Sequence, residues 1–168
     1  SDVDKLVQEL AWRDYFQRVA IEKNVDEDIK NKQTGVSYHG MPISILHATT
    51  GINAIDTAIK KLYQTGYMHN HHRMYLASLV CNLGQCHWKN GAQWMYYYLL
   101  DGDWASNACS WQWVAGSNSS KKYYANQDNI NKFDRSHQSG TFLDMPTEAL
   151  AGLQLPAALS QNHTWQPE

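Results

Sequence analysis

The stretch of residues 66–115 constrains this chain more than any other part of it. It reads GYMHNHHRMYLASLVCNLGQCHWKNGAQWMYYYLLDGDWASNACSWQWVA. Residues 69–80 are predicted to form a helix on which Asn70, Arg73 and Met74 are spaced three and four apart, and this spacing places them on one face. A polar group and a cation therefore share a helix face with a methionine.

A buried arginine needs a carboxylate partner, because an unpaired charge in a core costs several kcal/mol. Asp101 and Asp103 are the candidates, since they flank Gly102 in a turn after the predicted apolar helix 94–100. Taken alone, the Asp-Gly-Asp turn is equally compatible with an ordinary surface turn.

A further helix is predicted over residues 104–115. Asn107 lies on it, and Asn is a poor helix former that needs a reason to be there. Trp111 and Trp113 are two residues apart, so they cannot share a face and must meet two environments. Packing between helices is the ordinary role of such tryptophans.

The remaining chain also has a mainly helical pattern. An amphipathic helix is predicted over residues 3–22, with Glu9 on its polar face, Trp12 beside it and an apolar stripe that ends at Val19. Another helix is predicted over residues 52–62 and should stop at Gly66. Residues 24–48 are predicted to be a charged loop, and residues 151–168 a capping segment or a mobile tail.

Composition limits the class of protein. The length suits one domain, predicted over residues 1–150. No run approaches the roughly 20 apolar residues of a membrane span, and the polar start is no signal peptide, so no membrane contact and a cytoplasmic location are expected. The net charge of −2 gives no basic excess, so any contact with DNA must come from a local groove. The three cysteines suit neither a disulfide framework nor a metal site.

Together with TGINAIDTAIKKL before it and ELAWRDYF near the start, the central stretch resembles the flavin-binding helical domain of the DNA photolyase and cryptochrome family. The family pattern TGxPxxDAxxxxLxxTGxMHNRxRMxxASFL, an LDGD turn and an N-x-x-x-W-Q-W helix recur in the same order. The resemblance covers roughly residues 6–145. It implies an all-α fold, a helical bundle like the FAD-binding domain of photolyases but truncated at its N-terminal side.

The resemblance implies FAD as the cofactor. The residues that match the family's flavin-binding positions are Asn70, Arg73, Asp101, Asp103 and Asn107. In the family the first Asp of the turn pairs with the helix Arg, and the position of Asn107 faces N5 of the flavin ring.

The resemblance also implies a substrate cavity and an electron relay. Glu9, Trp12, Met74 and Trp113 match residues that contact an extruded pyrimidine dimer. Trp111 and Trp88 match the inner and middle tryptophans of the relay, and they join Asn107 as the predicted catalytic residues. The sequence has no tryptophan between Trp12 and Trp88, so the outer relay position lacks one.

The implied activity is light-driven repair of cyclobutane pyrimidine dimers, a carbon–carbon lyase reaction. The implied partners are UV-damaged DNA and a further polypeptide, either a second chain or the N-terminal half of the same protein. Two alternatives stay open: a cryptochrome-like photosensor without repair activity, and a flavin-free helical remnant that acts as an interaction module.

Overall fold

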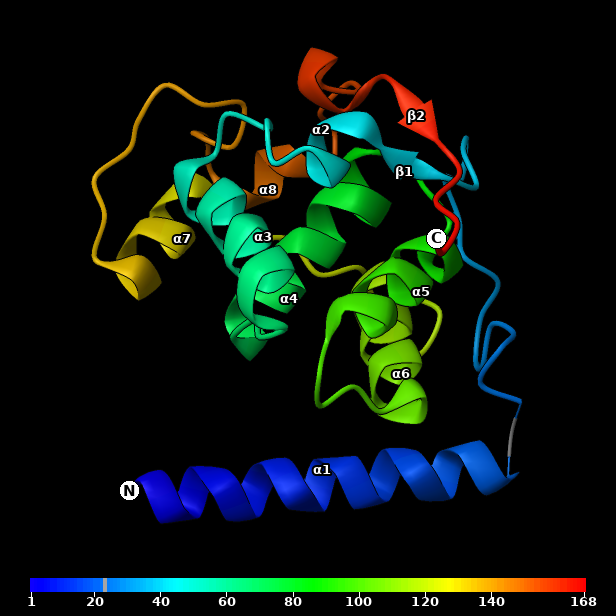
Figure 1. The fold of residues 1–168 in the computed structure, drawn as a ribbon. Coiled ribbons are helices and arrows are strands. Elements are labelled where there is room, and N and C mark those ends of the chain that lie inside the picture. The colour runs from blue at the N-terminus through cyan, green and yellow to red at the C-terminus, as the bar shows by residue number, and fades with distance from the viewer. Residues whose placement is uncertain (23) are drawn as a thin grey trace.

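The computed structural model of the chain describes residues 1–22 and 24–168, with the backbone alone for residues 19–22. The fold is mostly helical, as predicted (Figure 1). In chain order the elements are α1 (Asp2–Glu22), β1 (Met41–Pro42), α2 (Ile43–Leu46), α3 (Asn53–Thr65), α4 (Asn70–Ser78), the π-helical turn η1 (Leu79–Leu83), α5 (Trp88–Tyr98), α6 (Trp104–Ala115), α7 (Gln127–Asp134), α8 (Thr147–Leu150), the 3₁₀ turn η2 (Ala157–Leu159) and β2 (Asn162–His163).

Helix α6 is at the centre of the packing and lies against α1, α4 and α5. The core between these helices is rich in aromatic side chains, since Trp88, Trp94 and Trp111 are fully buried. Each large ring removes much apolar area from water, and at roughly 25 cal/mol per Å² this burial is the main stabilising term. The same packing fixes where the polar residues of α4 and α6 lie.

Local signals set the ends of two helices that matter for the site. Asp103 caps α6, because its Oδ2 accepts a hydrogen bond from the backbone N–H of Ser106 at 3.2 Å. Capping of this kind satisfies a donor that the first turn leaves unpaired. Helix α3 ends at Gly66, whose φ of 71° is the left-handed conformation that glycine adopts readily. Both the helix over residues 104–115 and the stop at Gly66 follow the prediction.

Other boundaries differ from the prediction. The helix predicted over residues 69–80 becomes a π-helical turn after Ser78. The helix predicted over residues 94–100 begins earlier, at Trp88, and ends at Tyr98. His87 explains the earlier start, because its ring nitrogen accepts a hydrogen bond from the N–H of Lys89 at 3.2 Å and caps the helix.

The loop predicted over residues 24–48 contains two short elements that the sequence pattern did not indicate. Strand β1 pairs antiparallel with β2, and helix α2 follows β1 directly. Within residues 151–168, Leu159 is buried and the N–H of Trp165 donates to the side chain of Asn90 at 2.9 Å. These contacts hold the C-terminal segment against α5 and β1.

Helix α1 crosses one end of the molecule, beneath α6 in Figure 1. Its predicted apolar stripe is largely exposed in its first half, where Val3 is 67 % exposed and Leu6 56 %. No other described element covers these residues, because α1 uses its middle turns to contact the pocket beside α6. The side chain of Val19 lies outside the described residues. Across the described helices, none combines the length and apolarity that crossing a membrane requires.

Candidate flavin and substrate pocket

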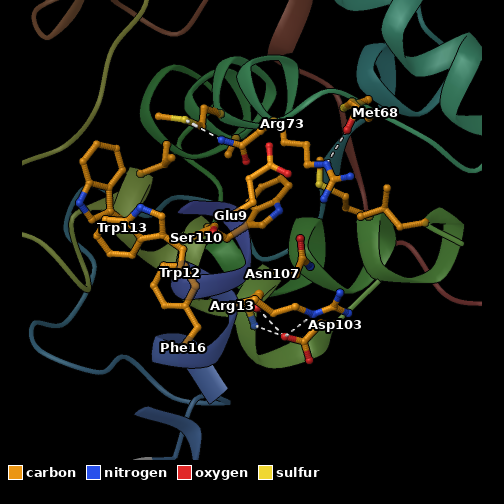
Figure 2. A pocket seen from close by; sticks show the side chains of 18 of the residues that line it. Glu9, Trp12, Arg13, Phe16, Met68, Arg73, Asp103, Asn107, Ser110 and Trp113 are labelled. Carbon is orange, nitrogen blue, oxygen red and sulfur yellow. Dashed lines mark hydrogen bonds and ion pairs between the residues drawn. The ribbon is translucent and has the colours of Figure 1, made fainter. Parts of the chain in front are cut away.

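A cavity of about 490 Å³ opens between α1, α4, α5 and α6 (Figure 2). Its size lies within the range typical of small-molecule sites. All of the predicted site residues except Trp88 line it: Glu9, Trp12, Asn70, Arg73, Met74, Asp101, Asp103, Asn107, Trp111 and Trp113. Residues far apart in the sequence thus converge on one cavity.

Arg73 contributes a positive charge to the wall formed by α4. Its Nε donates to the backbone oxygen of Met68 at 2.6 Å, and its Nη2 lies 3.8 Å from Oδ1 of Asp101. Burial lowers the pKa of the guanidinium, and the nearby charge of Asp101 opposes that shift. The predicted pairing of Arg73 with Asp101 is therefore present but long, and the carbonyl of Met68 is the contact that orients the side chain.

The two carboxylates of the Asp-Gly-Asp turn differ in their surroundings. The side chain of Asp101 is 66 % exposed, whereas that of Asp103 is 19 % exposed. Asp103 caps α6 through Oδ2, which also accepts from the hydroxyl of Ser106 and lies 3.9 Å from Nε of Arg13. Its contacts with the described residues use Oδ2, so Oδ1 is the oxygen available to a ligand.

Asn107 is 8 % exposed and holds a fixed orientation. Its Nδ2 donates to the backbone oxygen of Ala92 on α5 at 2.7 Å. Because the amide nitrogen is used in this way, Oδ1 is the polar atom that can accept a hydrogen bond from a ligand. This arrangement suits a ring N–H donor such as the one a reduced flavin presents.

Asn70 and Met74 lie one turn apart on α4, and the Asn70 amide is 3.8 Å from the sulfur of Met74. Asn70 is exposed and Met74 is half-buried. Asn70, Arg73 and Met74, which were predicted to share a helix face, all line the cavity.

The other end of the cavity is aromatic and open. Trp12 is 53 % exposed and Trp113 is 43 % exposed. Trp12 stacks on Phe16, with ring centroids 5.8 Å apart and an angle of 28° between the planes. Figure 2 draws these three rings together at one end of the cavity, with Glu9 between them and Arg73. Flat exposed rings of this kind are suited to stacking on bases.

The tryptophans of the predicted relay lie in the core. Trp111 is 2 % exposed and lines the cavity, whereas Trp113, two residues later, is exposed, so the two meet different environments. Trp88 is fully buried at the start of α5 and does not line the cavity. Trp88 is therefore not part of the cavity wall, unlike Trp111.

Several lining residues were absent from the sequence-based prediction of the site. They are Arg13, Phe16, Tyr67, Met68, Ser106 and Ser110, among others. A helical signal for two of them existed, since Arg13 and Phe16 follow Glu9 and Trp12 by four residues on α1. Ser106 and Ser110 gave no such signal, because their position depends on how α6 turns toward α1.

The family described as the FAD binding domain of DNA photolyase matches residues 6–164. A deoxyribodipyrimidine photo-lyase of Streptomyces griseus is 32 % identical over 68 % of this chain and 26 % of its own length. A cryptochrome DASH of Xenopus laevis is 31 % identical over 66 % of this chain and 22 % of its own length.

A solved structure shows the same fold. The cryptochrome of Synechocystis superimposes with a TM-score of 0.70 at 27 % identity, covering 79 % of this chain and 29 % of that one. The chain belongs to the DNA photolyase and cryptochrome family, and it matches the part of that family described as the FAD binding domain. It spans roughly a quarter of the length of these relatives.

Proposed function

We propose that this chain forms the flavin and substrate pocket of a light-driven enzyme that repairs cyclobutane pyrimidine dimers in DNA, with FAD as its cofactor. The observation that carries the proposal is that polar side chains gather at one end of the cavity, called here the inner end, and aromatic side chains at the other, called the outer end (Figure 2). The inner end consists of Arg73, Asp103 and Asn107, and the outer end of Trp12 and Trp113.

The inner end fits a flavin. Oδ1 of Asn107 can accept from a ring N–H, and the charge of Arg73 favours an electron-rich ring. Oδ1 of Asp103 can accept from a hydroxyl, as a ribityl or ribose group provides. FAD, when bound, supplies light absorption and transfer of a single electron. The residues named here bind and orient it.

The outer end fits two adjacent bases. A damaged pyrimidine pair is poorly stacked, so it leaves the duplex at lower cost than an intact pair. Trp12 and Trp113 offer apolar faces, and Met74 offers a soft, polarisable contact. Glu9 lines the cavity between these rings and Arg73 and can accept hydrogen bonds from the base edges. No nucleophile or metal is needed in this scheme.

The test has two steps on the purified chain. After incubation with FAD and gel filtration, the protein should carry flavin absorption. Blue light should then remove dimers from an irradiated thymine oligonucleotide once the flavin is reduced. Flavin uptake without light-dependent repair would favour the photosensor alternative. A chain that takes up no flavin would contradict the proposal and favour the interaction module.

The photosensor alternative keeps the same inner end and differs only in what the outer end binds. The similarity to the Xenopus cryptochrome DASH supports this photosensor alternative.

The exposed apolar residues of α1 support binding of a further polypeptide, because rows of exposed apolar residues on one helix usually contact something. Sedimentation of the chain alone should then show self-association that Leu6→Glu reduces.

A further inference from the structure

The fully buried tryptophans differ in what their indole N–H groups contact. Nε1 of Trp88 donates to Oδ1 of Asp28 at 2.7 Å. Nε1 of Trp94 donates to the hydroxyl of Tyr63 at 3.1 Å. Nε1 of Trp111 has no hydrogen-bond partner among the described residues. Of these core indoles, Trp88 therefore has a carboxylate as its acceptor.

Asp28 is built into a network that keeps its carboxylate charged. Its Oδ2 accepts from the backbone N–H of Gln33 at 2.7 Å, and its Oδ1 lies 3.3 Å from Nε2 of His87. Burial alone would raise the pKa of Asp28, but the hydrogen bonds from Trp88 and Gln33 and the charge of His87 outweigh it and lower the pKa. The contact with Trp88 is thus charge-assisted and short.

A path to solvent continues from this carboxylate. The side chain of Asp28 is 17 % exposed and that of His87 is 23 % exposed. Burial lowers the pKa of His87, although the charge of Asp28 opposes that shift. His87 stacks on the exposed ring of His39, with centroids 5.7 Å apart.

Trp111 connects this network to the pocket. It lines the cavity on one side, and on the other its six-membered ring lies against the backbone of Gly91. A Cβ at Gly91 would collide with that ring. Gly91 is three residues after Trp88 on α5, one turn along the helix. The glycine therefore allows Trp111 to lie between the cavity and the turn that carries Trp88.

We propose that Asp28 is the proton acceptor of Trp88, and that this pair ends the electron path from the pocket. The inference rests on the proposed function. One electron leaves Trp88 by way of Trp111 for a one-electron oxidant in the pocket, a photoexcited oxidised flavin. The Nε1–H bond of Trp88 breaks, and the proton forms an O–H bond on Oδ1 of Asp28. Trp88 becomes a neutral radical and Asp28 a neutral acid.

The difference between the two indoles gives this path a direction. An oxidised Trp111 would stay a cation, since no described residue can accept its proton. A cation in a core is costly without a partner. On Trp88 the positive charge lies beside a carboxylate and is then removed by proton transfer. The charge separation is held at Trp88, and the path does not need an outer tryptophan.

The experiment compares Asp28→Asn with Asp26→Asn. Asp26 is a matched control, because its carboxylate accepts from Nε1 of Trp104 at 2.7 Å in the same loop but at an exposed site. After a blue flash on the FAD-loaded protein, transient absorption distinguishes a neutral tryptophan radical from a cation. The original chain and Asp26→Asn should give the long-lived neutral radical.

In Asp28→Asn the radical should remain a cation and recombine about tenfold faster, which corresponds to about 1.4 kcal/mol. A neutral radical of unchanged lifetime in this variant would overturn the proposal. If the variant fails to fold, the original chain still decides the matter in heavy water. There, conversion of the cation to the neutral radical should slow, and an unchanged rate would overturn the proposal.

A second readout needs no flavin. In the flavin-free protein labelled with ¹⁵N-tryptophan, the indole signal that Trp88→Phe removes should shift in Asp28→Asn and stay in place in Asp26→Asn. An unshifted signal would refute the contact itself. If the contact is present but the chain takes up no flavin, it is the proposed function that has failed. If flavin binds and the radical stays cationic in the original chain, only the role of Asp28 has failed.

Discussion

The two ends of the pocket are built in different ways. At the inner end, Asn107 is buried and Arg73 is partly buried, and both are held by contacts to the backbone, at Ala92 and Met68. At the outer end, Trp12 and Trp113 are about half exposed. A fixed, enclosed end suits a resident cofactor, and an open aromatic end suits a ligand that arrives and leaves.

The largest effect is expected when the positive charge at the inner end is removed. Arg73→Leu should weaken binding of FAD by about 2–5 kcal/mol, because a partly buried cation and its contacts are lost. Titration of flavin fluorescence measures the change. Lys60→Leu, on the exposed side of α3, should leave the affinity unchanged. Equal affinity in Arg73→Leu and the original chain would refute the inner end as a flavin site.

A substitution at the outer end should change the binding of DNA and not the binding of flavin. Trp12→Ala should weaken binding of a dimer-containing oligonucleotide by about 1–3 kcal/mol, the usual loss for one stacking ring. Flavin affinity should stay the same. Fluorescence anisotropy of a labelled oligonucleotide measures the loss. Tyr15→Ala is the matched control, since Tyr15 is a half-exposed aromatic on α1 that does not line the pocket.

If Trp12→Ala lowered the affinity for flavin and for DNA equally, the two ends would not be separate. Trp12 would then act as a packing residue of the whole cavity.

Rigidity at the inner end can be tested through Asn107. Asn107→Ala removes the hydrogen bond from the side-chain amide to the backbone oxygen of Ala92, which should cost about 1–2 kcal/mol of unfolding free energy. Ser110→Ala, one turn further along α6, should change that free energy by less than about 0.5 kcal/mol. Urea denaturation measures both. An Asn107→Ala protein as stable as Ser110→Ala would mean that the amide does not hold α5 and α6 together.

The smallest expected effect is a loss of folding stability at acidic pH, and it should originate at neither end of the pocket. The pKa of His87 is below its ordinary value of 6.5, chiefly through burial. The unfolded chain therefore takes up this proton first, and stability should decline as the pH falls below about 6.5. The lowered pKa of Asp28 acts in the same direction below its ordinary value of 3.8. Urea denaturation at pH 7 and pH 5 measures the contribution of His87.

His87→Asn keeps a capping side chain for α5 and should flatten this dependence between pH 7 and pH 5. Unchanged pH dependence would place the acid sensitivity elsewhere, with His69 as the next candidate, because burial lowers its pKa as well.

The sequence predicted the mainly helical fold, and the resemblance indicated which residues to expect in one cavity. Helical periodicity and capping signals are local, so the extent of α6 and the stop at Gly66 could be read from neighbouring residues. The pairing of β1 with β2 joins residues far apart in the chain. The two strands are too short to show an alternating pattern, so the sequence contained no signal that predicts this pairing.

The contact between Asp28 and Trp88 was equally hidden. Asp28 lies in a charged stretch that resembles a solvated loop, and only the folded chain shows that its carboxylate meets a buried indole. The exposed stripe of α1 shows the converse. Periodicity identified the helix correctly, but it does not reveal whether a neighbour covers the apolar side.

Asp103 has two tasks, because the carboxylate that starts α6 also faces the cavity. Winding the first turn of that helix and shaping the binding wall are consequently one event. A ligand that grips this carboxylate would fasten the helix start, and heat that frays the helix start would loosen the ligand. Melting temperature and occupancy should therefore rise and fall together in this protein.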